Sequence, residues 1–353
     1  MTSHVTSTRT AISQGKALEN KVYFYAPDAR SHHFFDKQKL SWADIFEARQ
    51  NHSGNFTSWI LSTYLHLRKT GIDCEVIDHL PEQGIVLADR DTLGNRNAYL
   101  GKLMLICAKG DREFHPSAHL HVVHNPVDFK EKVQTPWSPH YIPHWPQPNL
   151  IPRAKSRGTL VENIAFIGSR SNLASEFYSE KWISALSSLG CQWTPLFASH
   201  QWCDYSKIDA VVAVRNFDNR DYEHKPASKL INCWHSSVPA ILAPESAFLA
   251  IQKSELDFLT VRSLDETINA VKSLKNSPEL YQAIVNNGNK RAQEITDATV
   301  TTYWESFFQD YVFPEYRRWV TASEATRFSS FSNRCLRLKA DRLKSRLLHP
   351  FKQ

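Results

Sequence analysis

The sequence predicts an α/β fold made of two Rossmann-like, doubly wound domains, each built on a parallel sheet. Two observations lead to this prediction: short apolar runs alternate with helical patterns in both halves, and a proline-rich segment separates the halves. Strands that are buried on both faces read as continuous apolar runs, and their alternation with helices indicates parallel pairing. The length of 353 residues suits two domains of ordinary size.

The second half shows this alternation most clearly. Ser277 followed by Pro278 has the form of a helix N-cap and a first helical residue, so a helix is expected to start there. We expect strands at 163–168, 191–197, 209–215, 239–244 and 257–262, and helices at 172–189, 227–236, 245–252, 265–275 and 277–296.

The first half is less regular but follows the same scheme. We expect strands at 22–25, 74–78, 84–89, 103–108 and 119–124, and a helix at 57–70.

Seven prolines lie between Pro126 and Pro152. Proline fixes φ and cannot donate a ladder hydrogen bond, so this stretch is expected to form neither a helix nor a central strand. We interpret it as the linker between the domains. The predicted organisation is a flexible N-terminus at 1–20, a first domain at 21–125, the linker at 126–158, a second domain at 159–300, a closing helix at 301–320 and a basic amphipathic tail at 321–353.

Several features favour a cytoplasmic protein. The first 20 residues contain no apolar run of the kind found in signal peptides, and no stretch reaches the ~18 apolar residues of a membrane span. The six cysteines are scattered and show no C-x-x-C spacing. This argues against a zinc site and a disulfide framework, and we expect neither a metal nor a cofactor.

The net charge of +6 is confined to one end of the chain. Residues 334–353 hold seven Lys or Arg against one Asp, which accounts for the whole net charge. A neutral body argues against a nucleic-acid partner, which would need basic residues on the folded face. Within 333–349, apolar residues recur at helical spacing among basic ones, namely Leu336, Ala340, Leu343 and Leu347. Such a helix could lie on an anionic membrane surface, and the protein would then be peripheral at the inner membrane face. The alternatives are that the helix stays solvated or packs on this protein or on a partner.

Doubly wound sheets bind ligands outside the carboxyl ends of their strands, so residues in the loops are the first candidates. Gly54 and Asn55 precede a helix that Thr57 or Ser58 can cap. Glycine lets the backbone approach a ligand, and the free N–H groups at a helix start favour a phosphate. The alternative is an ordinary loop and helix cap with no ligand, which would have the same sequence pattern.

A second candidate is the segment 224–232. Lys225 and Lys229 are four residues apart at the start of a predicted helix, and Arg215 ends the strand before it. Cations are disfavoured at a helix N-terminus, so two of them there indicate an anion such as a diphosphate. The alternative is a solvated surface helix.

Glu245 is a third candidate, since it follows a strand and begins a helix. A carboxylate there can accept hydrogen bonds from ribose or sugar hydroxyls, although acids are also common at helix starts.

Together, and in this order, these segments resemble the GT-B glycosyltransferases, particularly their retaining group-1 class, over residues 22–320. The stretch from Gly54 to Thr70, followed by GIDCEV at 71–76, looks like the glycine loop, helix and strand of that class. NCWHSSVPA at 232–240 looks like its acidic helix and "G-x-P-V" turn. IPHWPQP at 142–148 is shared with related bacterial glycosyltransferases.

The resemblance implies two domains facing a cleft and the transfer of a hexose-like sugar from a nucleoside-diphosphate sugar to a glycan, lipid-linked or small-molecule acceptor, as in polysaccharide biosynthesis. No D-x-D pair marks a metal-binding loop, so lysines and helix dipoles would neutralise the leaving group. The expected donor-binding residues are Gly54, Asn55, Gly168, Arg215, Lys225, Ser228, Lys229, Asn232 and Glu245.

One departure separates this sequence from the retaining class. Two glutamates are usual at the positions that His224 and Asn232 occupy here. Asn232 can still bind a ribose, so the resemblance supports nucleotide-sugar binding better than a retaining mechanism. A nucleotide-sugar epimerase of the same fold, or a non-catalytic nucleotide-sugar-binding or scaffold protein in glycan assembly, is the alternative.

An inverting reaction would need a general base from the N-terminal side of the cleft. Histidine suits this role because it titrates near neutrality. The candidates for this base are Asp28, His32, Asp36 and His52, and also His33 and His124. At most one of them is the base, and a residue of this kind is more often structural.

Overall fold

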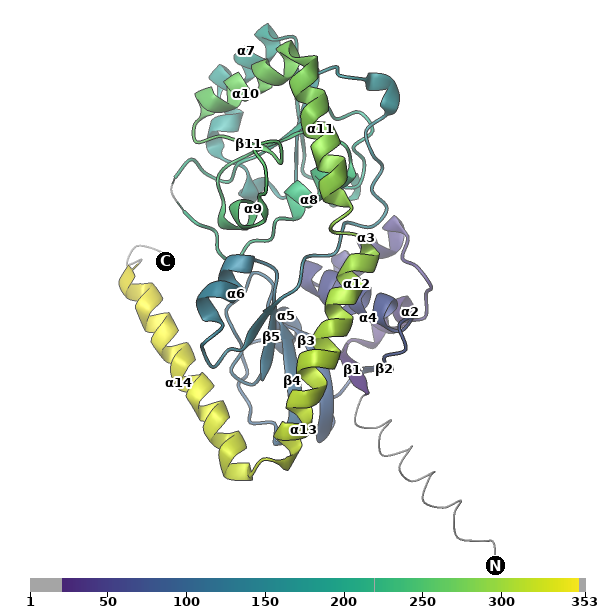
Figure 1. The fold of residues 1–353 in the computed structure, drawn as a ribbon, viewed down its shortest axis with the longest axis vertical. Coiled ribbons are helices and arrows are strands. Elements are labelled where there is room, and N and C mark those ends of the chain that lie inside the picture. Colours follow the sequence, from purple (N-terminus) through teal and green to yellow (C-terminus); the bar gives the residue numbers. More distant parts are fainter. Residues whose placement is uncertain (1–20, 219, 349–353) are drawn as a thin grey trace, which may run out of the picture.

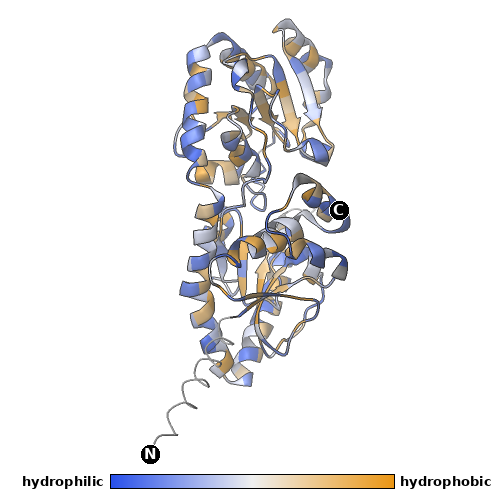
Figure 2. Ribbon diagram, turned by 90° about the vertical axis from the view of Figure 1, so that its right-hand side faces the viewer, coloured by the Kyte–Doolittle hydropathy of each residue, from blue (hydrophilic) through white to orange (hydrophobic). Residues whose placement is uncertain are grey.

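The computed structural model describes residues 21–218 and 220–348 and contains two parallel sheets, one in each domain (Figure 1). The sheet orders are β2-β1-β3-β4-β5-β6 and β11-β10-β9-β7-β8. Hydrophobic residues concentrate in the strands (Figure 2). The predicted α/β fold with two doubly wound parallel-sheet domains is therefore confirmed. The expected flexible N-terminus at 1–20 and residues 349–353 of the expected tail lie outside the described residues.

The N-terminal sheet pairs every neighbouring strand in parallel, and its central strands are buried on both faces. Its strands are β1 (Val22–Tyr25), β2 (Cys74–Ile77), β3 (Gln83–Asp89), β4 (Lys102–Ala108), β5 (Leu120–Val123) and β6 (Pro139–Tyr141). The surrounding helices are η1 (Ala29–Ser31), α2 (His32–Phe35), α3 (Trp42–Asn51), η2 (Phe56–Leu61), α4 (Ser62–Leu67), α5 (Arg90–Leu93) and α6 (Pro126–Lys132).

The C-terminal sheet has the strand order of a flavodoxin-like fold. Its strands are β7 (Asn163–Ile167), β8 (Gln192–Leu196), β9 (Ala210–Ala213), β10 (Ala240–Leu242) and β11 (Leu259–Thr260). The main helices around it are α7 (Glu180–Ser188), α8 (Ser228–His235), α9 (Ser246–Ile251), α10 (Leu264–Asn276) and α11 (Pro278–Ala292). As predicted, Ser277 caps α11, since its hydroxyl accepts from the N–H of Leu280.

The helix expected at 172–189 is wrong in its first half. Two short turns, η4 (Arg170–Asn172) and η5 (Ser175–Tyr178), occupy that part, and α7 begins only at Glu180. The reason is Ser179, whose backbone is extended and whose hydroxyl caps the N–H of Trp182.

The prediction that 126–152 forms no helix is also wrong at its start. Pro126 occupies the first turn of α6, where no N–H is required, and Asn125 caps that helix. Further along, β6 is the edge strand beside β5, the position in a sheet that tolerates Pro139. The first part of the expected linker therefore belongs to the N-terminal domain.

After α11 the chain returns to the N-terminal domain (Figure 1). The returning segment comprises α12 (Asp297–Ser306), η7 (Phe307–Val312) and α13 (Phe313–Thr321), so the closing helix starts slightly earlier than expected. α12 packs on α4, and the buried rings of Trp59 and Trp304 lie 6.3 Å apart. The two domains are thus joined twice, by the linker and by this segment.

The basic tail forms helix α14 (Glu324–Leu348), which runs along the outside of the N-terminal domain (Figure 1). Leu338 is buried, Arg334 Nε donates to the carbonyl oxygen of Pro116 at 2.8 Å, and Trp137 Nε1 donates to Asp341 Oδ2 at 2.9 Å. One face of the helix is therefore anchored to the domain. Among the helices of the described residues, none has the length and apolarity needed to cross a bilayer.

Asp209 fixes the base of the C-terminal sheet. Its buried carboxylate accepts hydrogen bonds from Arg153 and Arg157 and from the N–H groups of Glu162 and Asn163, at 2.7–3.0 Å. Burial raises the pKa of Asp209, but these donors outweigh it and hold the pKa below its usual value. The charged carboxylate thus links β9 to the start of β7.

We expect Asp209→Asn to lower the free energy of unfolding by about 3–5 kcal/mol, because the buried Arg153 loses its counter-charge. Urea unfolding followed by circular dichroism measures this. Asp265→Asn is the matched control, since its ion pair with Lys181 is exposed and contributes about 0–1 kcal/mol. Equal losses in the two variants would contradict the role given to Asp209.

Candidate functional site

Loops from both domains line one cavity of about 560 Å³. In the C-terminal domain, residues just after β7 and β9 take part, and these strands flank the switch point where the strand order reverses. The N-terminal domain contributes the loop before η2 and residues just after β4 and β5. The predicted architecture of two domains facing a cleft is thus what the structure has.

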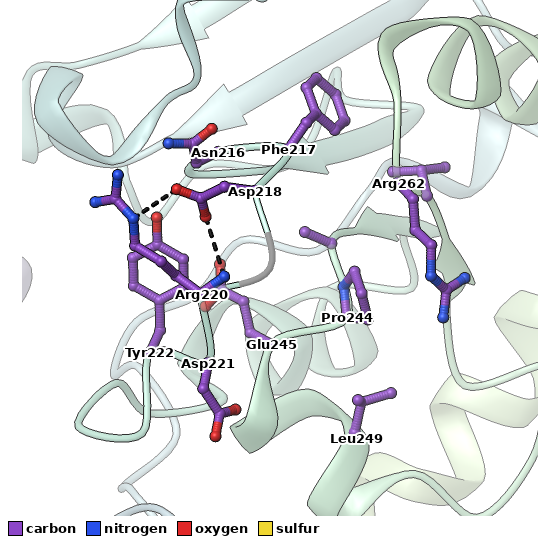
Figure 3. A pocket seen from close by; sticks show the side chains of 12 residues that line it. Asn216, Phe217, Asp218, Arg220, Asp221, Tyr222, Pro244, Glu245, Leu249 and Arg262 are labelled. Atoms are coloured by element: carbon purple, nitrogen blue, oxygen red, sulfur yellow. Dashed lines mark hydrogen bonds and ion pairs between the residues drawn. The ribbon is translucent and has the colours of Figure 1, made fainter. Parts of the chain in front are cut away.

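Most of the predicted donor-binding residues lie around this cavity. Glu245 lies in an adjacent cavity of about 440 Å³, which Figure 3 shows. The residues that line the larger cavity are Gly54, Asn55, Gly168, Arg215, Lys225, Ser228, Lys229 and Asn232.

Lys229 has an unusual environment for a cation. It lies in the first turn of α8, and its Nζ is 5.5 Å from the centre of the Phe166 ring. No carboxylate lies within ion-pair distance of Nζ in the part of the chain that the structure describes. Burial lowers the pKa of Lys229 to about 8, and the positive charge of Arg215 adds to this effect. The ammonium therefore lacks a close counter-charge.

Gly168 makes room for this ammonium. Its φ of +145° lies in a region that side chains rarely adopt, and a Cβ there would be 3.3 Å from Lys229 Nζ. Among the described residues, no side chain caps the N-terminus of α8, which begins at Ser228. Gly168, the first turn of α8 and the lysine ammonium thus lie around the same cavity, an arrangement typical of an anion site.

Arg215 and Glu245 connect the two cavities. Their side chains form an ion pair, and Arg215 Nε also donates to Asn172 Oδ1 at 3.3 Å. Burial raises the pKa of Glu245, although Arg215 opposes this. Its Oε1 is buried and accepts no hydrogen bond from the described residues. Glu245 therefore offers an acceptor to a hydroxyl-bearing ligand.

The smaller cavity lies outside the ends of β9, β10 and β11. Tyr222 and Arg220 stand on one side of it, and Leu249 and Arg262 lie across from them (Figure 3). Its walls combine an aromatic ring, aliphatic groups and hydrogen-bonding groups, as small-molecule sites commonly do.

The N-terminal domain places Asp111 and His124 on the cavity, with Asp111 in contact with Lys225. Asp111 Oδ2 lies 2.5 Å from Lys225 Nζ, and its Oδ1 lies 3.5 Å from His124 Nε2. His124 Nε2 also lies 2.9 Å from the carbonyl oxygen of His224, so this nitrogen carries the proton. Burial lowers the pKa of His124 to about 4, and its Nδ1 has no partner among the described residues.

The sequence did not single out Asp111. Its only local signal is its place three residues after β4, at the carboxyl end of a buried strand. The contact with Lys225 joins residues 114 positions apart, which no local pattern can indicate.

The four candidate bases lie elsewhere, since none of them lines the larger cavity. Asp28 pairs with Arg30, which lowers the pKa of the carboxyl to about 2. His32 Nε2 contacts the carbonyl oxygen of Ala26 at 2.9 Å, and Asp36 is exposed. His52 stacks on Phe56, and burial lowers its pKa. The groups of the N-terminal domain that do line the cavity include Asp111, His124 and His144.

Within residues 21–218 and 220–348, no group of three or more His, Cys, Asp or Glu side chains is placed to hold a metal ion.

Comparison with known proteins finds similarity only at the level of structure. No protein-family model and no curated protein matches the chain. Anabaena HepE in complex with UDP and glucose is 11% identical, with a TM-score of 0.48, over 82% of this chain and 99% of that chain. Sucrose-phosphate synthase from Thermosynechococcus elongatus is 10% identical, with a TM-score of 0.49, over 84% of this chain and 100% of that chain. Both TM-scores lie below 0.5, so the geometry of the site, and not these similarities, decides the chemistry.

We expect Gly168→Ala to weaken the binding of inorganic pyrophosphate by at least about tenfold, because the methyl group displaces Lys229 and removes a charge-assisted hydrogen bond. Isothermal titration calorimetry measures this. Gly190→Ala is the matched control, with a φ of +62° and open space around its Cβ except for Lys275 Nζ at 3.9 Å. It also places a side chain at a positive φ, but away from the cavity, and should bind like the wild type. Unchanged binding in Gly168→Ala would contradict the anion site.

Proposed function

We propose that the protein is a glycosyltransferase that binds a nucleoside-diphosphate sugar between its two domains and transfers the sugar to an acceptor hydroxyl. The observation that carries the proposal is the convergence of Arg215, Lys225 and Lys229 on one interdomain cavity. Arg215 and Lys225 are each paired with a carboxylate, whereas Lys229 has no such pair within residues 21–218 and 220–348. The cavity thus keeps a positive charge for a ligand that brings negative charge.

The diphosphate of the donor fits best beside Lys229, Gly168 and the start of α8. The N–H groups of the helix start and the ammonium would bind its oxygens. The same groups would stabilise the charge that develops on the nucleoside diphosphate as the bond to the sugar breaks.

The nucleoside would then extend toward the smaller cavity. Glu245 Oε1 would accept hydrogen bonds from ribose hydroxyls, which satisfies an oxygen that is otherwise buried without a donor. Tyr222 and Leu249 would flank the base. Asn232 lines the larger cavity and donates to Gln147 Oε1 at 3.1 Å, so it is held by the linker close to the donor.

The acceptor would approach from the N-terminal domain. Its hydroxyl loses a proton during transfer, and we assign the acceptance of this proton to the Asp111 and His124 pair. Both residues line the cavity, and the side chain of Asp111 is 41% exposed, so its carboxylate can reach an acceptor there, with His124 Nε2 3.5 Å from its Oδ1. Asp28, His32, Asp36 and His52 are less suitable because they do not line it.

The experiment that tests the function has two stages. Thermal shift with UDP, GDP, ADP and dTDP identifies the nucleotide, because a ligand of the native state raises its melting temperature. The matching nucleotide sugars are then incubated with and without glycan and lipid-linked acceptors, and released nucleoside diphosphate is measured.

Release that depends on an acceptor supports a transferase. A sugar epimerised with donor alone would identify an epimerase instead, and binding with no turnover on any acceptor would identify a non-catalytic binding protein. No nucleotide binding at all would contradict the proposal.

The pKa of Lys229 gives a pH dependence. The free protein loses the proton of Lys229 as the pH rises through about 8, and only the charged form attracts the diphosphate. We expect the affinity for the identified nucleoside diphosphate to fall by about tenfold between pH 7 and pH 9. Calorimetry across this range measures the effect.

Lys229→Arg is the control for this prediction, because arginine stays charged throughout the range. Its affinity should not fall between pH 7 and pH 9, whereas Lys229→Met should bind weakly at both. A wild-type affinity that is constant with pH would contradict a direct contact between Lys229 and the phosphates.

A further inference from the structure

We infer that the outward face of helix α14 is a docking surface for an anionic lipid membrane. Three leucines define this leucine face: Leu336, Leu343 and Leu347 are 65%, 59% and 73% exposed. A single exposed leucine needs no explanation, but three on one helix are a feature that folding of this domain does not account for.

The leucine face points directly away from the protein. At 100° per residue, the three leucines lie within about 40° of one another around the helix axis. The anchoring residues Arg334, Leu338 and Asp341 project from the opposite side, where they contact the N-terminal domain. The helix is therefore fixed in a rotation that presents the leucines to solvent.

Cations flank the leucine face on both sides. By the same helical geometry, Lys339 and Arg346 lie along one edge of it, and Arg337 and Lys344 lie along the other. The one acid of 333–353 is Asp341, which accepts from Trp137 on the anchored side and forms an ion pair with Arg337 at 2.9 Å. Lys339, Lys344 and Arg346 therefore supply most of the positive charge beside the leucine face. An apolar stripe with a positive border is the pattern of helices that lie in a membrane interface.

Charge also decides between a membrane and a second copy of this chain. In a symmetric dimer the same face meets itself, which would bring the flanking cations of both copies together. Three leucines also cover far less than the ~800 Å² per partner of a standard protein interface. An anionic bilayer needs no such area, because it receives the leucines between its headgroups and attracts each cation.

The anchoring gives the docking a fixed orientation. The end of α14 reaches the height of α6, beside the junction of the two domains (Figure 1). A membrane bound to the leucine face would therefore lie along the N-terminal domain and extend toward that junction. The inference stands independently of the proposed transferase activity, because no residue of α14 lines either cavity.

The test is flotation of the full chain with vesicles of phosphatidylcholine alone and of phosphatidylcholine mixed with phosphatidylglycerol. We expect binding to the anionic vesicles only, and weaker binding as salt is added. The variant Leu336→Gln/Leu343→Gln/Leu347→Gln removes the apolar stripe, and Lys339→Gln/Lys344→Gln/Arg346→Gln removes three cations. The second variant should bind about 100-fold more weakly, and the first should lose binding as well.

A control variant, Leu160→Gln/Ile183→Gln, changes exposed apolar residues of the C-terminal domain that are 51% and 46% exposed. It should bind like the wild type, and all variants should keep the wild-type melting temperature because the changed side chains are exposed. Three results would overturn the inference: no binding to anionic vesicles, equal binding to neutral ones, or full binding by the leucine variant. A dimer in light scattering that the leucine variant dissociates would assign the face to a second copy.

Discussion

The structure around the candidate site depends on the position of one ammonium group, that of Lys229. It is held between Gly168, Phe166 and Arg215, with no carboxylate close enough to form an ion pair in the described chain. A partly buried cation without a counter-charge is unfavourable, so the site is arranged for an anion to complete it. Three features keep the site in this state. Gly168 leaves space for the ammonium, the start of α8 has no side-chain cap among the described residues, and Glu245 pairs with Arg215 rather than with Lys229.

Much of the fold could be predicted, because local patterns encode buried parallel strands. Strands β1 to β5 and β7 to β11 match apolar runs in the sequence, and the Ser277 cap lies where its side chain predicts. Helix α3 was missed although Ser41 and Asp44 form a reciprocal capping box, because its apolar residues show little helical periodicity. Helix α6 was missed because its proline was interpreted as a breaker, when only a proline inside the helix acts so.

The residues of the candidate site also divide into those that the sequence could predict and those that it could not. Its C-terminal half lies on loops that directly follow strands, so Gly168, Arg215 and Lys229 could be named from strand ends. In its N-terminal half, Gly54, Asn55 and His124 could also be named, but Asp111 could not, because it reaches Lys225 across the domain junction. Asp28, which the sequence suggested instead, is paired with Arg30 two residues away. Side-chain contacts between domains depend on tertiary packing, which no local pattern contains. The leucines of α14 were expected from their spacing, but only the docked helix places them outward.

The most direct test of this account is the pKa of Lys229 itself, measured by NMR on protein with carbon-labelled lysine side chains. The account predicts a value near 8 in the free protein, well below the ordinary 10.5, because burial and Arg215 disfavour the charged form. It also predicts a rise when a nucleoside diphosphate is added, since the phosphates supply the missing counter-charge. A pKa near the ordinary value in the free protein, or a pKa that nucleotide leaves unchanged, would contradict a direct contact between Lys229 and the phosphates.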